Sequence, residues 1–190
     1  MQIGLFFGSF NPIHSGHLII ANHILNFTSL DKVWFVVSPQ NPLKTNDELL
    51  DARARLKLVK MALSTDERFE VSDVEFNLPI PSYTIDTLKF LGEHHPQHDY
   101  HLIIGSDNFL NFSTWKSHNV LLKEWRIIVY VRPGFPVDKK ADFLNVQVLN
   151  LTLLDISSTN IRESIKEGKS IRYMVPEPVF AEIVSKKYYR

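Results

Sequence analysis

The sequence predicts an α/β protein whose sheet is doubly wound and mostly parallel, with helices on both faces. Short runs of β-branched, aromatic and other apolar residues alternate with longer amphipathic segments along the 190 residues. Most of the runs are apolar at every position, which is typical of parallel strands buried on both faces. Alternation of this kind, with right-handed crossovers, builds a doubly wound sheet whose ligands bind beyond the carboxyl ends of the strands.

Each element follows from its own pattern. Helix 49–63 has the clearest pattern, because Leu49, Ala52, Leu56, Val59 and Leu63 fall on one face. Pro178 suits the start of the last helix. In chain order, the predicted strands are 3–7, 33–37, 69–71, 101–104, 126–131 and 146–149, and the predicted helices are 18–27, 49–63, 84–93, 120–124, 160–166 and 179–187.

The composition predicts one globular domain, 1–190, with a C-terminal helical portion from about residue 157. The formal net charge is zero and charges do not cluster, so we expect no nucleic-acid partner. The apolar runs are too short for a membrane span. The absence of cysteine and of a basic segment at the start predicts a cytoplasmic protein. The sequence leaves open whether the chain forms a homo-oligomer.

A polar segment that contains two glycines follows the first predicted strand directly. The segment reads Gly8-Ser9-Phe10-Asn11-Pro12-Ile13-His14-Ser15-Gly16-His17 and leads into an amphipathic stretch. This order places two imidazoles at the N-terminus of a helix, where unpaired N–H groups and the helix dipole attract anions. The segment therefore predicts a phosphate site.

Two histidines three residues apart could also be half of a metal site, or surface residues. A zinc site needs a third and a fourth ligand, and the chain has no cysteine. His94, His95 and His98 cluster in a polar stretch without a matching carboxylate pattern. Gly8 and Gly16 instead allow a ligand to approach the backbone. We therefore expect no metal ligand among the protein side chains.

A second polar segment, Ile156-Ser157-Ser158-Thr159-Asn160-Ile161-Arg162, precedes a short amphipathic helix. All four residues from Ser157 to Asn160 are good N-cap types, and Asn160 has capping-box spacing to Glu163. Arg162 would then lie in the first helical turn, where the dipole disfavours a cation. A bound phosphate would explain the arginine, since guanidinium binds phosphate bidentately. The alternative is an arginine that points into solvent.

The two segments together resemble the nucleotidyltransferase superfamily, and the second resembles its adenylyltransferase branch. The segments 83–88 and 170–176 resemble those of bacterial nicotinate-mononucleotide adenylyltransferases, so the resemblance extends from residue 3 to about 184. It implies a Rossmann-like nucleotidyltransferase fold. Dinucleotide-dependent oxidoreductases are excluded, because Gly-x-Gly-x-x-Gly does not follow the first strand. Many relatives have Asp at position 11 and His at position 43, where this chain has Asn11 and Leu43.

The resemblance also implies roles for individual residues. His14, His17 and Arg162 would be catalytic. Tyr83, Thr84, Asp107 and Trp115 would bind the mononucleotide, with Trp115 stacked on its pyridine ring. ATP would contact a larger set, namely Gly8, Ser9, Phe10, His14, His17, Lys44, Gly105, Asp107, Arg132, Ser157, Ser158 and Arg162.

The implied reaction joins nicotinate mononucleotide to the adenylyl group of ATP and gives deamido-NAD and pyrophosphate, with Mg²⁺ as cofactor. An ionised phosphate is already a nucleophile, so direct in-line attack needs no covalent intermediate and no general base. We expect Thr84 to cap a helix whose N–H groups favour the acid over the amide, and we expect no hydrogen-bond acceptor for the amide nearby. Pantetheine phosphate or nicotinamide mononucleotide as acceptor, and a non-catalytic nucleotide-binding regulator, are the alternatives.

Overall fold

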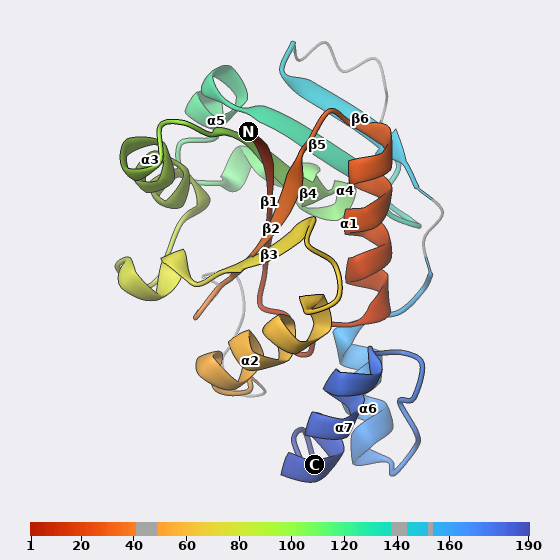
Figure 1. The fold of residues 1–190 in the computed structure, drawn as a ribbon. Helices are drawn as coiled ribbons and strands as arrows, with labels where there is room; N and C mark the ends of the chain where they lie inside the picture. The colour runs from red at the N-terminus through yellow and green to blue at the C-terminus, as the bar shows by residue number, and fades with distance from the viewer. Residues whose placement is uncertain (41–48, 138–143, 152–153) are drawn as a thin grey trace.

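The computed structural model describes residues 1–40, 49–137, 144–151 and 154–190. Six strands form one sheet in the order β3-β2-β1-β4-β5-β6, and every neighbouring pair is parallel (Figure 1). This confirms the predicted doubly wound α/β fold. The strands are β1 Gln2–Gly8, β2 Lys32–Val37, β3 Phe69–Ser72, β4 Asp99–Gly105, β5 Arg126–Val131 and β6 Val146–Asn150.

Helices connect these strands, and short helical turns that the periodicity did not reveal lie between them. The helices are α1 Ser15–Phe27, α2 Ala52–Leu63, α3 Thr84–His94, α4 Ser106–Phe109, α5 His118–Glu124, α6 Ser158–Lys166 and α7 Glu177–Lys186, with 3₁₀ turns η1 Val74–Asn77 and η2 Phe112–Thr114. The unexpected pieces η1, α4 and η2 have three or four residues each, too few for a helical period to show.

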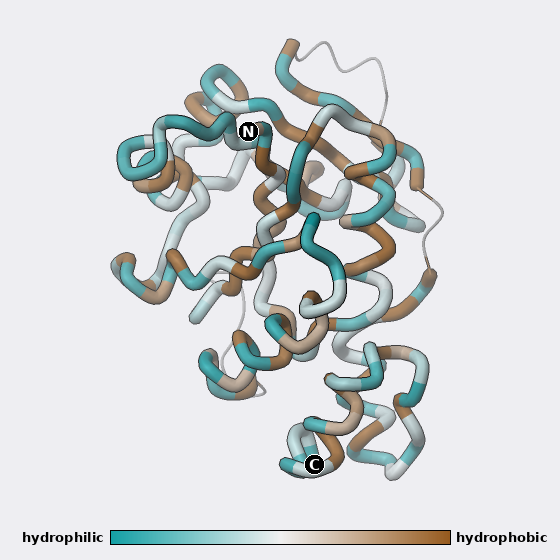
Figure 2. Tube along the Cα trace, in the orientation of Figure 1, coloured by the Kyte–Doolittle hydropathy of each residue, from teal (hydrophilic) through white to brown (hydrophobic). Residues whose placement is uncertain are grey.

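Alternate residues of the central strands enter two cores on opposite faces of the sheet. Phe6 and Ile103 pack toward α1 and α2 in one core. Leu5, Leu102 and Ile104 pack toward α3 and α5 in the other. The hydrophobic tube colour accordingly gathers along the central strands (Figure 2). Because both faces of these strands are covered, the strands read as continuous apolar runs.

The helix predicted at 49–63 begins three residues later than expected. Asp51 is its N-cap, and the carboxylate accepts the N–H groups of Arg53 and Ala54. The predicted apolar face was also rotated from the observed one. Leu49 lies outside the helix and Leu56 is only partly buried, whereas Arg55 is completely buried. A sequence pattern counts an arginine as exposed, so the buried Arg55 moved the predicted apolar face away from the observed one.

Four other helix starts differ from the sequence prediction, each because polar residues form part of the first turn. Helix α5 begins at His118 rather than at 120. Helix α1 begins at Ser15 rather than at 18, and α7 begins at Glu177, with Pro178 inside its first turn. Helix α6 begins at Ser158, because the Ser157 hydroxyl accepts the N–H of Asn160. The capping box expected from Asn160 and Glu163 is therefore wrong.

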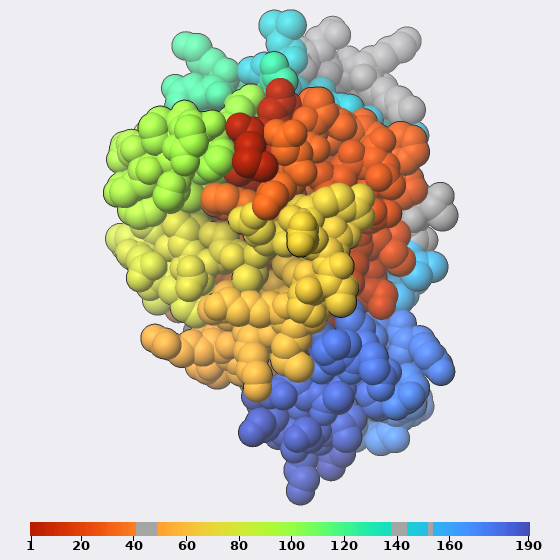
Figure 3. Space-filling view, in the orientation of Figure 1, coloured from red at the N-terminus to blue at the C-terminus, as the bar shows by residue number. Residues whose placement is uncertain are grey.

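Beyond the last strand, α6 and α7 pack beside α2 and the β1–α1 loop rather than on the sheet alone (Figures 1 and 3). Ile161, Val179 and Ile183 join the same core as Phe6. Lys57 on α2 forms an ion pair with Glu182 on α7 at 2.7 Å. The C-terminal helical portion is thereby held against the end of the sheet where ligands are expected.

Candidate nucleotide site

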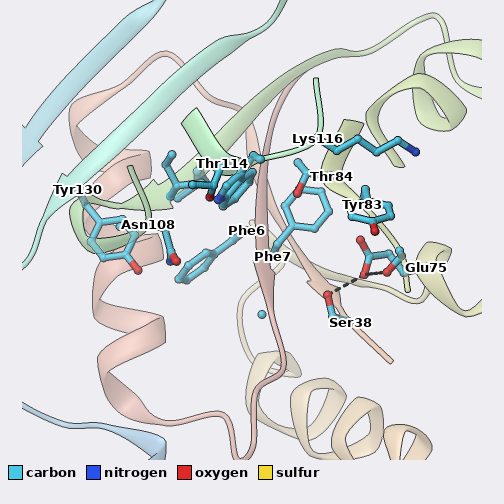
Figure 4. Close-up of a pocket in the computed structure, with 16 residues that line it drawn as sticks. Phe6, Phe7, Ser38, Glu75, Tyr83, Thr84, Asn108, Thr114, Lys116 and Tyr130 are labelled. Atoms are coloured by element: carbon cyan, nitrogen blue, oxygen red, sulfur yellow. Dashed lines mark hydrogen bonds between the residues drawn. The ribbon is translucent and has the colours of Figure 1, made fainter. Parts of the chain in front are cut away.

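Strands β2 and β3 extend the sheet on one side of β1, and strands β4 to β6 extend it on the other, so the topological switch point lies between β1 and β4. A pocket lies at this point. Strand order places β2 on one side of β1 and β4 on the other, so their carboxyl ends frame a crevice. The pocket has a volume of about 360 Å³ (Figure 4). Its walls come from β1, β4 and the segments after them, together with Ser38, Glu75, Tyr83, Thr84, Trp115, Lys116 and Tyr130.

The β1–α1 loop positions both histidines of the first motif. His14 is the N-cap residue of α1, and His17 lies in its first turn. The His14 backbone N–H donates to Nδ1 of His17 at 3.2 Å, and the ring centroids are 3.7 Å apart. A nitrogen that accepts this bond carries no hydrogen, so the hydrogen of a neutral His17 ring sits on Nε2. The prediction that both imidazoles lie at the helix N-terminus is confirmed.

His14 is more buried than a surface ligand would be. Its side chain is 5% exposed, and its Nδ1 atom has no hydrogen-bond partner in the described part of the chain. Burial, and secondarily the nearby Arg132 cation, lowers the pKa of His14 to about 4. His14 is therefore neutral at pH 7, and a neutral ring can still donate one hydrogen bond to a phosphate oxygen. A Cβ at Gly16 would lie 3.0 Å from the His14 ring, so the glycine makes room for it.

The second motif contacts the loop that carries the first motif. Arg162 donates from Nη1 to the carbonyl oxygen of Asn11 at 3.0 Å, and Ser158 donates to that of Pro12 at 2.9 Å. These bonds bring the two motifs together, and the expectation that both face one crevice stays a prediction. Because α6 starts at Ser158, Arg162 lies beyond the first turn, and the predicted conflict with the helix dipole is wrong.

The first motif's other members form a tightly packed loop. Phe10 has a positive φ of 45° and is 3% exposed, with its ring 5.1 Å from that of His17. A Cβ at Gly8 would lie 2.8 Å from the Phe10 ring, so this approach requires glycine. Ser9 is buried, and its hydroxyl has no hydrogen-bond partner among the described residues. Lys44 lies outside the described residues.

Two predicted residues from neighbouring strands pair with each other. Asp107 follows β4, and its Oδ2 accepts from Nη1 of Arg132, just after β5, at 2.8 Å. The other oxygen of Asp107 is buried without a hydrogen-bond partner in the described ranges. At Gly105 a Cβ would lie 2.4 Å from that oxygen. Gly105, Asp107 and Arg132 therefore form one unit beside the pocket.

Of the four residues predicted to hold the mononucleotide, Tyr83, Thr84 and Trp115 line the far end of the pocket, whereas Asp107 does not line it. Tyr83, not Thr84, is the N-cap residue of α3, and Thr84 is the first helical residue. Trp115 follows η2, stands partly exposed and contacts Phe112 at 5.1 Å between centroids. Lys116 lies 4.7 Å from the centre of the Tyr83 ring and pairs with Asp86. Figure 4 shows Tyr83, Thr84 and Lys116 on one side of the cavity.

Sequence reasoning missed a buried carboxylate in this pocket. Glu75, in η1, is 2% exposed. Its Oε2 accepts from the hydroxyls of Ser38 and Ser82, both at 2.7 Å, and its Oε1 accepts from Thr87 at 3.0 Å (Figure 4). The expectation that the pocket offers no hydrogen-bond acceptor is therefore wrong. The only signal in the sequence is an acidic residue between two apolar ones, Val74 and Phe76.

Arg55 was missed as well, and it supports two loops of the site from behind. Its guanidinium donates to the backbone carbonyls of Leu50, Ser9, Ser38 and Pro39. The Ser9 carbonyl belongs to the β1–α1 loop, and the other two loop carbonyls follow β2. One buried side chain thus ties these two loops together.

Comparison with known proteins shows the family of the chain. The sequence profile described as cytidylyltransferase-like matches residues 5–164. The chain belongs to the cytidylyltransferase-like family. It is 49% identical to a probable nicotinate-nucleotide adenylyltransferase of Cytophaga hutchinsonii, across 100% of this chain and 98% of that protein. It is 47% identical to one of Bacteroides fragilis, across 96% and 91% of the two chains.

Solved structures share the fold of this cytidylyltransferase-like chain. A Plasmodium falciparum nicotinic acid mononucleotide adenylyltransferase complexed with NaAD superposes with a TM-score of 0.84 at 21% identity, covering 99% of this chain and 97% of that one. A putative nicotinate-nucleotide adenylyltransferase of Vibrio parahaemolyticus gives 0.73 at 22% identity, covering 100% and 95%. None of the helices in the described ranges is both long and apolar enough to span a membrane.

Proposed function

We propose that this chain transfers the adenylyl group of ATP to nicotinate mononucleotide, giving deamido-NAD and pyrophosphate. The observation that carries the proposal is the meeting of the two motifs: His14 and His17 at the start of α1 lie beside Arg162 of α6, which contacts the same loop. The pocket at the end of β1 and β4 adjoins this cluster and has room for a second substrate. The names of the 41–49% identical relatives support the same reaction.

In this proposal the phosphate of the mononucleotide attacks the α-phosphorus of ATP in line, and pyrophosphate leaves. The Nε2 hydrogen of His17 is directed by the bond at its Nδ1 and would donate to the α-phosphate. Arg162 and the Ser157 hydroxyl would bind the outer phosphates. Fixed donors of this kind stabilise charge that develops in the transition state without reorganising. No general base is assigned.

Mg²⁺ is proposed to enter with ATP. Among the described residues no group of three or more His, Cys, Asp or Glu side chains could hold a metal ion. Mg²⁺ prefers oxygen ligands and keeps several waters, so it would be held by the phosphates. Once bound, it would neutralise part of the triphosphate charge. The single domain, the cytoplasmic location and the homo-oligomer considered from the sequence stay predictions.

A pyrophosphate-release assay with a panel of acceptors tests the proposal. We expect release with ATP and nicotinate mononucleotide, and much less with nicotinamide mononucleotide or pantetheine phosphate, because the N–H groups at the start of α3 favour an anion. No release with any acceptor would support the regulator instead. Equal kcat/KM with nicotinamide mononucleotide would instead assign the chain to the branch of the family that uses the amide as its acceptor.

A further inference from the structure

Glu75 determines the hydrogen-bonding character of one wall of the pocket. Three hydroxyls surround its two oxygens, which is the arrangement that an ionised carboxylate accepts. A hydroxyl has a single hydrogen, and Ser38 and Ser82 direct theirs at Oε2 of Glu75. The hydroxyl oxygens of Ser38 and Ser82 therefore offer only lone pairs to a group in the pocket. We call Ser38, Glu75 and Ser82 the acceptor wall.

The acceptor wall restricts what can lie against it. A phosphate or a carboxylate would meet oxygen lone pairs and a negative charge, which is unfavourable in a partly desolvated site. A neutral group that donates hydrogen bonds, such as a hydroxyl or an amide NH₂, would be satisfied there. Ser38 is the member that a ligand reaches most easily, because it is partly exposed while Glu75 and Ser82 are buried.

The position of Ser38 indicates which part of a mononucleotide would lie at the wall. The backbone N–H of Ser38 donates to the carbonyl of Gly8 at 3.0 Å. Ser38 therefore adjoins the start of the β1–α1 loop, where the phosphates are proposed to bind. On its other side, Ser82 leads directly to Tyr83 and Thr84, where the pyridine ring is proposed. The ribose is the part of a mononucleotide that lies between phosphate and ring, and its hydroxyls are donors.

We propose that the acceptor wall is the subsite for the ribose hydroxyls of the acceptor mononucleotide, and that Glu75 is the positioning residue that keeps Ser38 and Ser82 as acceptors. This inference rests on the proposed function. Glu75 also fixes the far end of the pocket, since Thr87 of α3 and Ser38 after β2 bind its two different oxygens. None of these bonds involves the histidines or Arg162.

The test compares nicotinate mononucleotide with its 2′-deoxy and 3′-deoxy forms as acceptors for pyrophosphate release. In the wild type we expect at least one deoxy form to lose about tenfold in kcat/KM, the effect of one well-formed hydrogen bond. In Ser38→Ala that ratio should fall to about one, and KM for the mononucleotide should rise while KM for ATP stays unchanged. Ser29→Ala, near the other end of the sheet, is the matched control and should keep the wild-type ratio.

Glu75→Gln provides the second variant. The amide has one oxygen acceptor and an NH₂ donor, so a neighbouring hydroxyl can turn its hydrogen into the pocket. We expect the deoxy ratio to shrink and KM for the mononucleotide to rise, again without a change in KM for ATP. Circular dichroism before the assay identifies a variant that has not folded, in which case Ser38→Ala decides.

Three results would overturn the inference. The first is wild-type activity that does not distinguish ribose from both deoxy forms. The second is a deoxy ratio that survives in Ser38→Ala and in Glu75→Gln. The third is a changed ratio between the acid and amide acceptors in Ser38→Ala with an unchanged deoxy ratio, which would assign the wall to an amide. Absence of pyrophosphate release with nicotinate mononucleotide itself would instead reject the proposed function.

Discussion

The bond from the His14 backbone to Nδ1 of His17 gives the His17 ring a defined donor. If this donor stabilises charge on the α-phosphate, His17→Ala should lower kcat by about 10²–10³-fold, because that is the usual cost of losing one preorganised donor. The dissociation constant of ATP should change much less. Steady-state kinetics together with equilibrium ATP binding measures both quantities.

The matched control for His17→Ala is His23→Ala, six residues further along α1, where the ring stacks on Phe27 at 4.8 Å. Its kcat should equal that of the wild type. If folded His17→Ala protein turned over at nearly the wild-type rate, His17 would have no role in the chemical step.

Arg162 combines a structural bond with its proposed phosphate contact. Arg162→Lys keeps the charge but loses the planar fork that binds phosphate bidentately. We expect KM for ATP to rise about tenfold or more. The free energy of unfolding should fall by only about 1 kcal/mol, because the lysine ammonium can still donate to the Asn11 carbonyl that Arg162 contacts. ATP titrations and urea unfolding separate the two effects.

Arg172→Lys is the control for Arg162→Lys. This exposed arginine pairs with Glu177 in the same helical portion, and both quantities should remain at their wild-type values. A large loss of stability with an unchanged KM in Arg162→Lys would make Arg162 a purely structural residue.

Among the elements, α2 is tied to two loops of the site by the side chain of Arg55. Three nitrogens of its guanidinium donate to four carbonyls, and an ammonium group cannot reproduce that geometry. Arg55→Lys leaves buried carbonyls without partners, so the free energy of unfolding should fall by about 3 kcal/mol. Thermal and urea unfolding measure the change.

Arg53→Lys, two residues earlier and exposed, provides the comparison and should leave stability within about 0.5 kcal/mol of the wild type. Equal stability of Arg55→Lys and Arg53→Lys would mean that the Arg55 bonds contribute nothing net.

The elements also show what the sequence could and could not predict. All six strands were placed within two residues at each end, because a parallel strand covered on both faces must be apolar throughout. Helix starts were displaced wherever polar residues, such as Ser15 and Asp51, supply the first turn or its cap. A period of apolar residues carries no information about those positions.

At the site, residues in a contiguous motif were predictable, and residues that act from a distance were not. His14, His17 and Arg162 stand in recognisable strings. Glu75, Ser38 and Arg55 come from three separate segments and become meaningful only when the sheet brings them together. Their polar character gave no hint of burial, since charged residues are usually exposed.

The stability of the whole molecule should depend on pH through buried histidines. Burial lowers the pKa of His14 from 6.5 to about 4, and burial also lowers the pKa of His101. Below pH 6.5, His14 becomes protonated in the unfolded chain, whereas in the folded protein it stays neutral until the pH approaches 4. The free energy of unfolding therefore has its full value above pH 6.5. It falls as the pH decreases toward 4, and His14 contributes about 3 kcal/mol to this decrease.

Urea unfolding of the wild type and of His14→Asn at several pH values between 7 and 4 tests this dependence. The free-energy difference between the two proteins should shift in favour of the variant as the pH falls. Parallel curves over the whole range would contradict the assignment.

The bonds from α6 to the β1–α1 loop have a consequence for the order in which the protein becomes competent. Translation delivers all six strands, and the two histidines that follow β1, before residue 151. Arg162 and Ser158, which contact Asn11 and Pro12, emerge only after these strands. A nascent chain can thus assemble its sheet while its β1–α1 loop still lacks its partner helix α6. On the proposed function, tight ATP binding would appear only after Arg162 has been made, when the sheet is already in place.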